Sequence, residues 1–117
     1  MTTLTDWTVE AARDGILVLD SESGLIIETN PFLAEILGCS REDLLGRPLE
    51  EIGLNAFCRG CDTLLEKVRR DGYCRCDSLP LKRRDGQSIF VELVGTSYRV
   101  DRRTMLQFNV GEVRDHL

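Results

Sequence analysis

Residues 73–110 read YCRCDSLPLKRRDGQSIFVELVGTSYRVDRRTMLQFNV and predict three consecutive β-strands. Near the end of this run, Leu106, Phe108 and Val110 alternate with more polar neighbours, which is the period of a strand with one buried face. Asp85-Gly86 is a strong hairpin signal, and residues 101–103 form a second turn. We therefore expect an antiparallel meander with strands at 73–83, 88–98 and 104–110.

In the first third of the chain, N-terminal to the meander, the pattern predicts another hairpin followed by a helix. Two aliphatic runs, GILVLD at 15–20 and LIIET at 25–29, flank turn residues. Asn30 is then a good N-cap and Pro31 a favourable first helical residue, and Gly38 ends the pattern. Residues 4–13 carry helical spacing and predict a short leading helix.

The middle third predicts several short helices. Ser40 is the N-cap of a helical turn that ends before Gly46 and Pro48. Residues 49–60 have a broken apolar pattern, so we expect only short helical pieces there. Residues 62–71, DTLLEKVRRD, form a clearer amphipathic helix that Gly72 closes.

Length and charge limit the functional classes. The 117 residues are enough for one domain, and 42% hydrophobic with 30% charged residues is typical of a globular chain. A formal net charge of −5 disfavours nucleic acid and anionic membranes as partners. The chain has no apolar run of transmembrane length and no signal-peptide pattern, so we expect a cytoplasmic protein without membrane contact by this segment.

The order of elements and several short motifs resemble the PAS sensory-domain family. The motifs are DGILVLD at 14–20, NPFLAEILG at 30–38, SREDLLGRP at 40–48, RRDGQSIFVEL at 83–93 and the closing NVGE at 109–112. The resemblance spans about residues 14–113. It implies an α+β fold in which a five-stranded antiparallel sheet, in strand order 2-1-5-4-3, has short helices over one face. The corresponding division is a flanking helix at 1–13, a sensor domain at 14–111 and the start of an outgoing signalling helix at 112–117.

The resemblance also implies a function. The chain resembles a non-catalytic sensing and interaction module of a bacterial signal-transduction protein, for which we expect a sensor histidine kinase of a two-component phosphorelay. The alternatives are a module of a diguanylate cyclase or transcriptional regulator that serves only dimerisation, and a thiol-redox sensor. Apolar character and position suggest that a small ligand would contact Phe32, Ile36, Phe57, Leu65 and Leu79.

The closing motif of the family usually reads Asp, apolar, Thr, and helps to anchor the outgoing helix. Asn109 and Gly111 stand at the Asp and Thr positions here. We expect Asn109 and Glu112 to take part in signal transfer to a downstream effector domain in the same polypeptide. The leading helix, which carries Trp7, is expected to form a homodimer contact or to cover the domain's own sheet.

Cofactor motifs of the family are incomplete in this sequence. Haem sensors of the family use a His before the third strand, whereas the single His here is His116, near the end of the sequence. Flavin photosensors use a G-R-N-C-R-F-like motif, but the matching run, Gly46-Arg47-Pro48-Leu49, has no thiol. Haem and covalent flavin are therefore disfavoured, noncovalent flavin stays open, and no cofactor is required.

The five Cys residues raise the question of metal or redox chemistry. Cys58 and Cys61 form a C-x-x-C, and Cys74 and Cys76 form a C-x-C twelve residues later. A predicted helix between the pairs disfavours one shared metal site. Cys58 and Cys61 are the redox candidates, because Cys61 would lie near a helix N-terminus that lowers a thiol pKa. The alternative is that both thiols only line the apolar interior.

Other polar groups carry weaker signals. The basic run Lys82-Arg83-Arg84 could attract an anion, but its charge and its place at a turn favour a solvated turn. No Gly-rich phosphate loop, acid/base pair or Ser-His-Asp set is present, which disfavours catalysis.

Overall fold

The computed structural model describes residues 15–52, 57–58 and 62–113. Its elements are, in chain order, β1 (Gly15–Asp20), β2 (Ile26–Thr29), α2 (Pro31–Leu37), α3 (Arg41–Leu44), the 3-10 helix η1 (Leu49–Ile52), β3 (Phe57–Cys58), β4 (Asp62–Thr63), α4 (Leu64–Asp71), β5 (Tyr73–Lys82), β6 (Ser88–Val100) and β7 (Arg103–Glu112).

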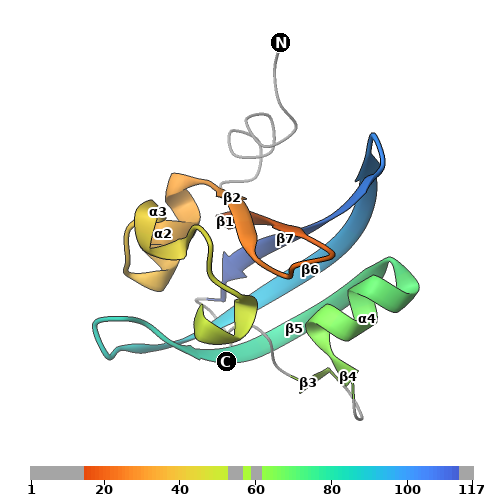
Figure 1. Cartoon of the computed structure of the whole chain (residues 1–117). Helices are drawn as coiled ribbons and strands as arrows, with labels where there is room; N and C mark the ends of the chain where they lie inside the picture. The colour runs from red at the N-terminus through yellow and green to blue at the C-terminus, as the bar shows by residue number, and fades with distance from the viewer. Residues whose placement is uncertain (1–14, 53–56, 59–61, 114–117) are drawn as a thin grey trace.

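Five strands form one antiparallel sheet in the order β2-β1-β7-β6-β5 (Figure 1). Counted along the chain within this sheet, the order is 2-1-5-4-3, as expected from the sequence. The first hairpin and the three-strand meander are both confirmed, with β6 and β7 extending to the turn at residues 101–102. The two-residue strands β3 and β4 pair separately.

One face of the sheet and the helices enclose the core. Leu17 pairs with Phe108 and Phe108 with Gly95, so these three residues share a face, and α4 packs over it through Val68. A Cβ at Gly95 would lie 2.7 Å from Phe108 Cε1 and 2.9 Å from Val68 Cγ2. Glycine is therefore what lets α4 and β7 approach β6 closely here.

Side-chain caps set the helix starts. Asn30 caps α2, with Pro31 at the first position, and Gly38 ends the helix at a φ of 75°. Ser40 caps α3 as expected. Thr63 and Glu66 form a capping box at α4, so this helix begins at Leu64, two residues later than the sequence pattern suggested, because the reciprocal hydrogen bonds fix its start.

The segment 49–60 was only partly predicted. Its first residues form η1, but Phe57 and Cys58 form a short strand paired with Asp62 and Thr63, where we expected only helical pieces. The local apolar pattern could not reveal this pairing, since a two-residue strand leaves no period to read. The leading helix expected at 4–13 lies outside the described residues.

The other face of the sheet also has buried side chains. Ile16 pairs with Asn109 and Val18 with Gln107, so all four lie on the face opposite to Leu17 and Phe108. Ile16 is fully buried, and Val18 and Gln107 are nearly so. Within the described residues, no helix is long and apolar enough to cross a membrane.

Candidate functional site

A groove of about 510 Å³ lies between the helical corner of the domain and strand β5. We call it the α3–β5 groove. Leu37, Leu44 and Leu81 line it from α2, α3 and β5 and belong to the buried core, while the half-buried Ile52 comes from η1. The volume falls within the range of small-molecule sites, which are mostly apolar with a few polar groups.

Charged side chains line the same groove. Arg84 Nη1 donates to Asp43 Oδ2 at 3.0 Å, and Arg47 Nη1 donates to Glu51 Oε1 at 3.0 Å. Lys82 and Glu50 are exposed lining residues. The groove therefore offers an apolar surface beside groups of both signs, which suits a small amphipathic ligand.

A second groove, which we call the α2–β7 groove, has a volume of about 1130 Å³. It lies between α2 and the end of β7. Phe32, Ile36 and Cys39 line it from the α2 side, and Glu92 and Glu112 line it from β6 and β7. The chain leaves the sheet beside it, where the backbone N–H of Val113 donates to the carbonyl of Phe90 at 2.8 Å.

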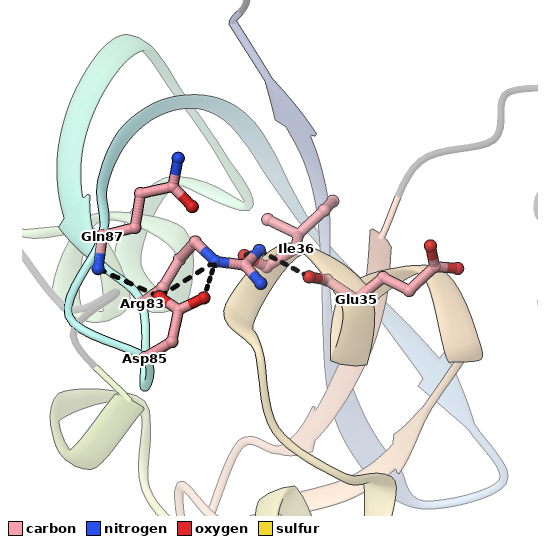
Figure 2. A network of polar contacts seen from close by, with 5 residues as sticks. All are labelled: Glu35, Ile36, Arg83, Asp85 and Gln87. Atoms are coloured by element: carbon pink, nitrogen blue, oxygen red, sulfur yellow. Dashed lines mark hydrogen bonds and ion pairs between the residues drawn. The ribbon is translucent and has the colours of Figure 1, made fainter.

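The β5–β6 turn is held against the carboxyl end of α2 by Arg83 (Figure 2). Its Nη1 donates to the carbonyl oxygens of Glu35 at 2.7 Å and Ile36 at 2.8 Å. Its Nε donates to the Asp85 carboxylate within its own turn. A cation at a helix C-terminus satisfies carbonyls that have no intrahelical partner and opposes the negative end of the dipole.

Arg84 extends this contact to the next two elements. Its backbone N–H donates to the Leu37 carbonyl at 3.0 Å, and its side chain forms the ion pair with Asp43 of α3. Gly38 has no Cβ, and one placed there would lie 3.1 Å from Arg83 Nη2. Together these contacts fix the hairpin to the α2–α3 corner and so fix one wall of each groove.

This contact corrects the expectation that Lys82, Arg83 and Arg84 form only a solvated turn. Lys82 is exposed, but the Arg83 side chain is only 21% exposed and caps a helix. No spacing in the sequence joins residue 35 to residue 83, because the pairing depends on how the hairpin folds over α2.

The carboxylates at this corner are stabilised in their charged form. Hydrogen bonds from Ser40 and the neighbouring Arg84 hold the pKa of Asp43 below its ordinary value. The hydrogen bond from the Gln87 backbone N–H, and to a lesser extent the one from Arg83, lowers the pKa of Asp85. Both groups are therefore anionic near neutral pH.

The described cysteines do not form an activated centre. Burial raises the pKa of the Cys39 thiol, although Arg84 partly opposes the effect, so its thiolate is disfavoured. Cys74 is fully buried and Cys76 packs against the core. In the segments with described placement, no three Cys, His, Asp or Glu residues are grouped to hold a metal.

The redox candidates are located only in part. Cys58 belongs to β3, but its side chain is outside the description, and Cys61 lies outside the described residues altogether. Thr63, and not Cys61, caps α4. Cys61 precedes this cap by two residues in the sequence, and the redox activity of Cys58 and Cys61 stays a prediction.

The expected ligand residues are dispersed in the structure. Phe32 and Ile36 line the α2–β7 groove, whereas Leu79 lies in the core at 6% exposure. Leu65, on α4, is half-buried and lies near Gly24, which precedes β2. Phe57 is described only as part of β3. Apolar character alone did not separate core residues from groove residues.

The two expected signal-transfer residues lie at the end of β7. Asn109 is half-buried and its Oδ1 accepts a hydrogen bond from Gln107 Nε2 at 3.0 Å. Glu112 is exposed and pairs with Val91 of β6. Their position agrees with a role at the chain exit, and that role stays a prediction.

The sheet and its helices define a small α+β domain with two grooves, and comparison with known proteins gives the family. The sequence profile described as "PAS domain" matches residues 13–115. The chain belongs to the PAS domain family. A comparison with curated proteins finds no match.

Solved structures of PAS domains share this fold. The PAS domain of nitrogen regulation protein NR(II) from Vibrio parahaemolyticus aligns with a TM-score of 0.73 and 17% identity, covering 96% of this chain and 100% of that one. A PAS domain from a two-component sensor histidine kinase aligns with a TM-score of 0.68 and 17% identity over 92% and 91% of the two chains. A light-oxygen-voltage domain studied with a flavin analogue aligns with a TM-score of 0.71 and 18% identity, covering 98% of this chain and 88% of that one.

The family assigns a sensory role in signal transduction, and its domains are generally not catalytic. In the motif resemblance described above, Leu49 stands where flavin photosensors of the family carry the thiol that forms the covalent adduct. Leu49 is an aliphatic residue at 1% exposure. The residues present therefore do not fit that chemistry.

Proposed function

We propose that this domain is the cytoplasmic sensing module of a bacterial sensor histidine kinase in a two-component phosphorelay. The α3–β5 groove is the observation that supports sensing, because it combines an apolar surface with charged groups and a suitable volume. The similarity to a histidine kinase PAS domain supports the parent protein by analogy of fold. The ligand is a small amphipathic molecule, and no cofactor is required.

The proposed response begins at η1, α3 and β5, which line the groove. A ligand that binds one arrangement of these elements more tightly shifts the population toward it. β5 is hydrogen-bonded to β6 and β6 to β7, and β7 ends at the chain exit. The sheet thereby carries a change at the groove toward Asn109 and Glu112, and from there to an effector domain downstream.

Native mass spectrometry tests this function on the purified protein, before and after incubation with a low-molecular-mass extract of bacterial cells. Ile52→Trp fills the α3–β5 groove, while Ile27→Trp places the same side chain on β2, at a residue that is 45% exposed and outside both grooves. We expect the wild type and Ile27→Trp to retain a small molecule that Ile52→Trp loses. A protein that retains nothing from the extract would contradict ligand sensing and favour a pure interaction module.

A further inference from the structure

The α2–β7 groove carries negative charge from two different elements. Glu35 comes from α2 and Glu92 from β6, and both are exposed. Among the described lining residues, the one cation is Arg83. Its guanidinium donates to two carbonyls of α2 and pairs with Asp85. The field that this groove presents to solvent is therefore negative.

The groove also has an apolar floor and a fixed shape. Ile36 and Cys39 lie half-buried along α2, and Gly38 and Gly111 expose backbone beside them. The Arg83 and Arg84 contacts hold the α2 wall against the hairpin. A partner would meet a preformed surface, which lowers the ordering cost of binding.

The turn between β6 and β7 has the complementary character. Arg99 and Arg102 are exposed, and Arg103 is 61% exposed while it pairs with Asp20 at 2.6 Å. Val100 is 47% exposed next to the turn, although turn residues are usually polar. We call residues 99–103 the β6–β7 tip. It contains three arginines, one exposed aspartate, Asp101, and one apolar side chain, so it carries net positive charge in a chain whose net charge is −5.

A single copy cannot bring these two surfaces together. Both are built on β6 and β7, where Val91 pairs with Glu112 at the groove end and Val100 with Arg103 at the tip. These positions are nine residues apart along β6, or about 30 Å at the usual rise of a strand. Figure 1 shows the tip projecting away from α2 and α3.

We propose that the β6–β7 tip of one copy docks in the α2–β7 groove of a second copy. Arg99 and Arg102 then face Glu35 and Glu92, and Val100 covers the Ile36 floor. The contact is heterologous, since each copy uses a different surface, and it extends head to tail unless the rotation closes a ring. A partner docked there lies beside the chain exit, so association and the output of β7 become linked.

Charge-reversal variants test this arrangement by sedimentation velocity over a concentration series at low salt. Glu92→Lys breaks the groove and keeps the tip, whereas Arg102→Glu breaks the tip and keeps the groove. Glu22→Lys is the control, because it makes the same charge change at an exposed residue of the β1–β2 turn, next to Asp20, and so adds positive charge near the tip without removing a groove carboxylate. We expect self-association of the wild type and the control, and at least a tenfold weaker association of each of the other two variants.

Mixing the two weakened variants gives the decisive result. The intact tip of Glu92→Lys fits the intact groove of Arg102→Glu, and the two reversed charges attract each other at the second interface, so the mixture associates although neither variant does so alone. Retained thermal unfolding midpoints show that neither variant is misfolded. A wild-type protein that stays monomeric at high concentration overturns the proposal. So does a mixture that remains monomeric, or equal weakening by Glu22→Lys.

Discussion

Replacing Asn30 by alanine is the perturbation whose cost follows most directly from the structure. Asn30 Oδ1 accepts hydrogen bonds from the N–H of Leu33 in α2 and from the N–H of Ile16 in β1, both at 3.0 Å. The residue is 3% exposed, so water does not replace the lost acceptor. Each buried donor left without a partner costs about 1–3 kcal/mol, which places Asn30→Ala, with its two donors, at about 2–6 kcal/mol of destabilisation. That is a large share of the roughly 5–15 kcal/mol that stabilises a domain.

Urea denaturation followed by far-UV circular dichroism measures this cost. Ser40→Ala is the control, because it removes an exposed N-cap with one backbone bond, at 3.3 Å, and is expected to cost about 1 kcal/mol. The midpoint of Asn30→Ala should fall well below that of Ser40→Ala, with similar slopes. If the two variants lose equal stability, the bond from Ile16 contributes nothing and the reasoning is refuted.

Three further changes have defined outcomes. Gly95→Ala places a methyl group 2.7 Å from Phe108 Cε1 and should lower the free energy of unfolding, measured by urea denaturation, by about 1–3 kcal/mol. An unchanged midpoint would show that the core accommodates the methyl group without loss of stability. Arg83→Met removes the cation that caps α2 and should lower the thermal midpoint more than Arg75→Met, whose ion pair with Asp77 is exposed; the reverse order would contradict the capping role. Asp43→Asn should be less stable than the wild type at neutral pH. Because the folded pKa of Asp43 is lowered, this difference is present above about pH 4 and should vanish as the pH falls through the folded value. A difference that is independent of pH in thermal unfolding would exclude an electrostatic origin.

The strands of the sheet and helix α2 could be predicted because their sequence signals are local. Asn30, Pro31 and Gly38 mark the two ends of α2, and alternating side chains mark β7. The strand order came from the family resemblance, since local patterns do not specify which strands pair. The start of α4 was missed by two residues because Thr63 and Glu66 cap each other within a segment that already looked helical.

The candidate site was less predictable, because it depends on contacts between distant residues. Phe32, Ile36 and Leu79 are all apolar, yet the first two line the α2–β7 groove and the third fills the core. Arg83 seemed to be a turn residue, and its role at α2 depends on a contact across 47 and 48 positions of sequence. Periodicity reports which face of an element is buried, but not which distant element covers it.

Amide hydrogen exchange at the end of β7 tests most directly whether groove occupancy reaches the chain exit. The relevant amide is that of Val113, which donates to the Phe90 carbonyl at 2.8 Å. Exchange is measured by NMR on the protein with its retained small molecule and on the same protein after that molecule is removed. We expect protection at Val113 and along β7 to change together with protection at η1 and β5. A change confined to the groove, with β7 and Val113 exchanging at the same rate in both samples, would contradict the proposed route of signal transfer.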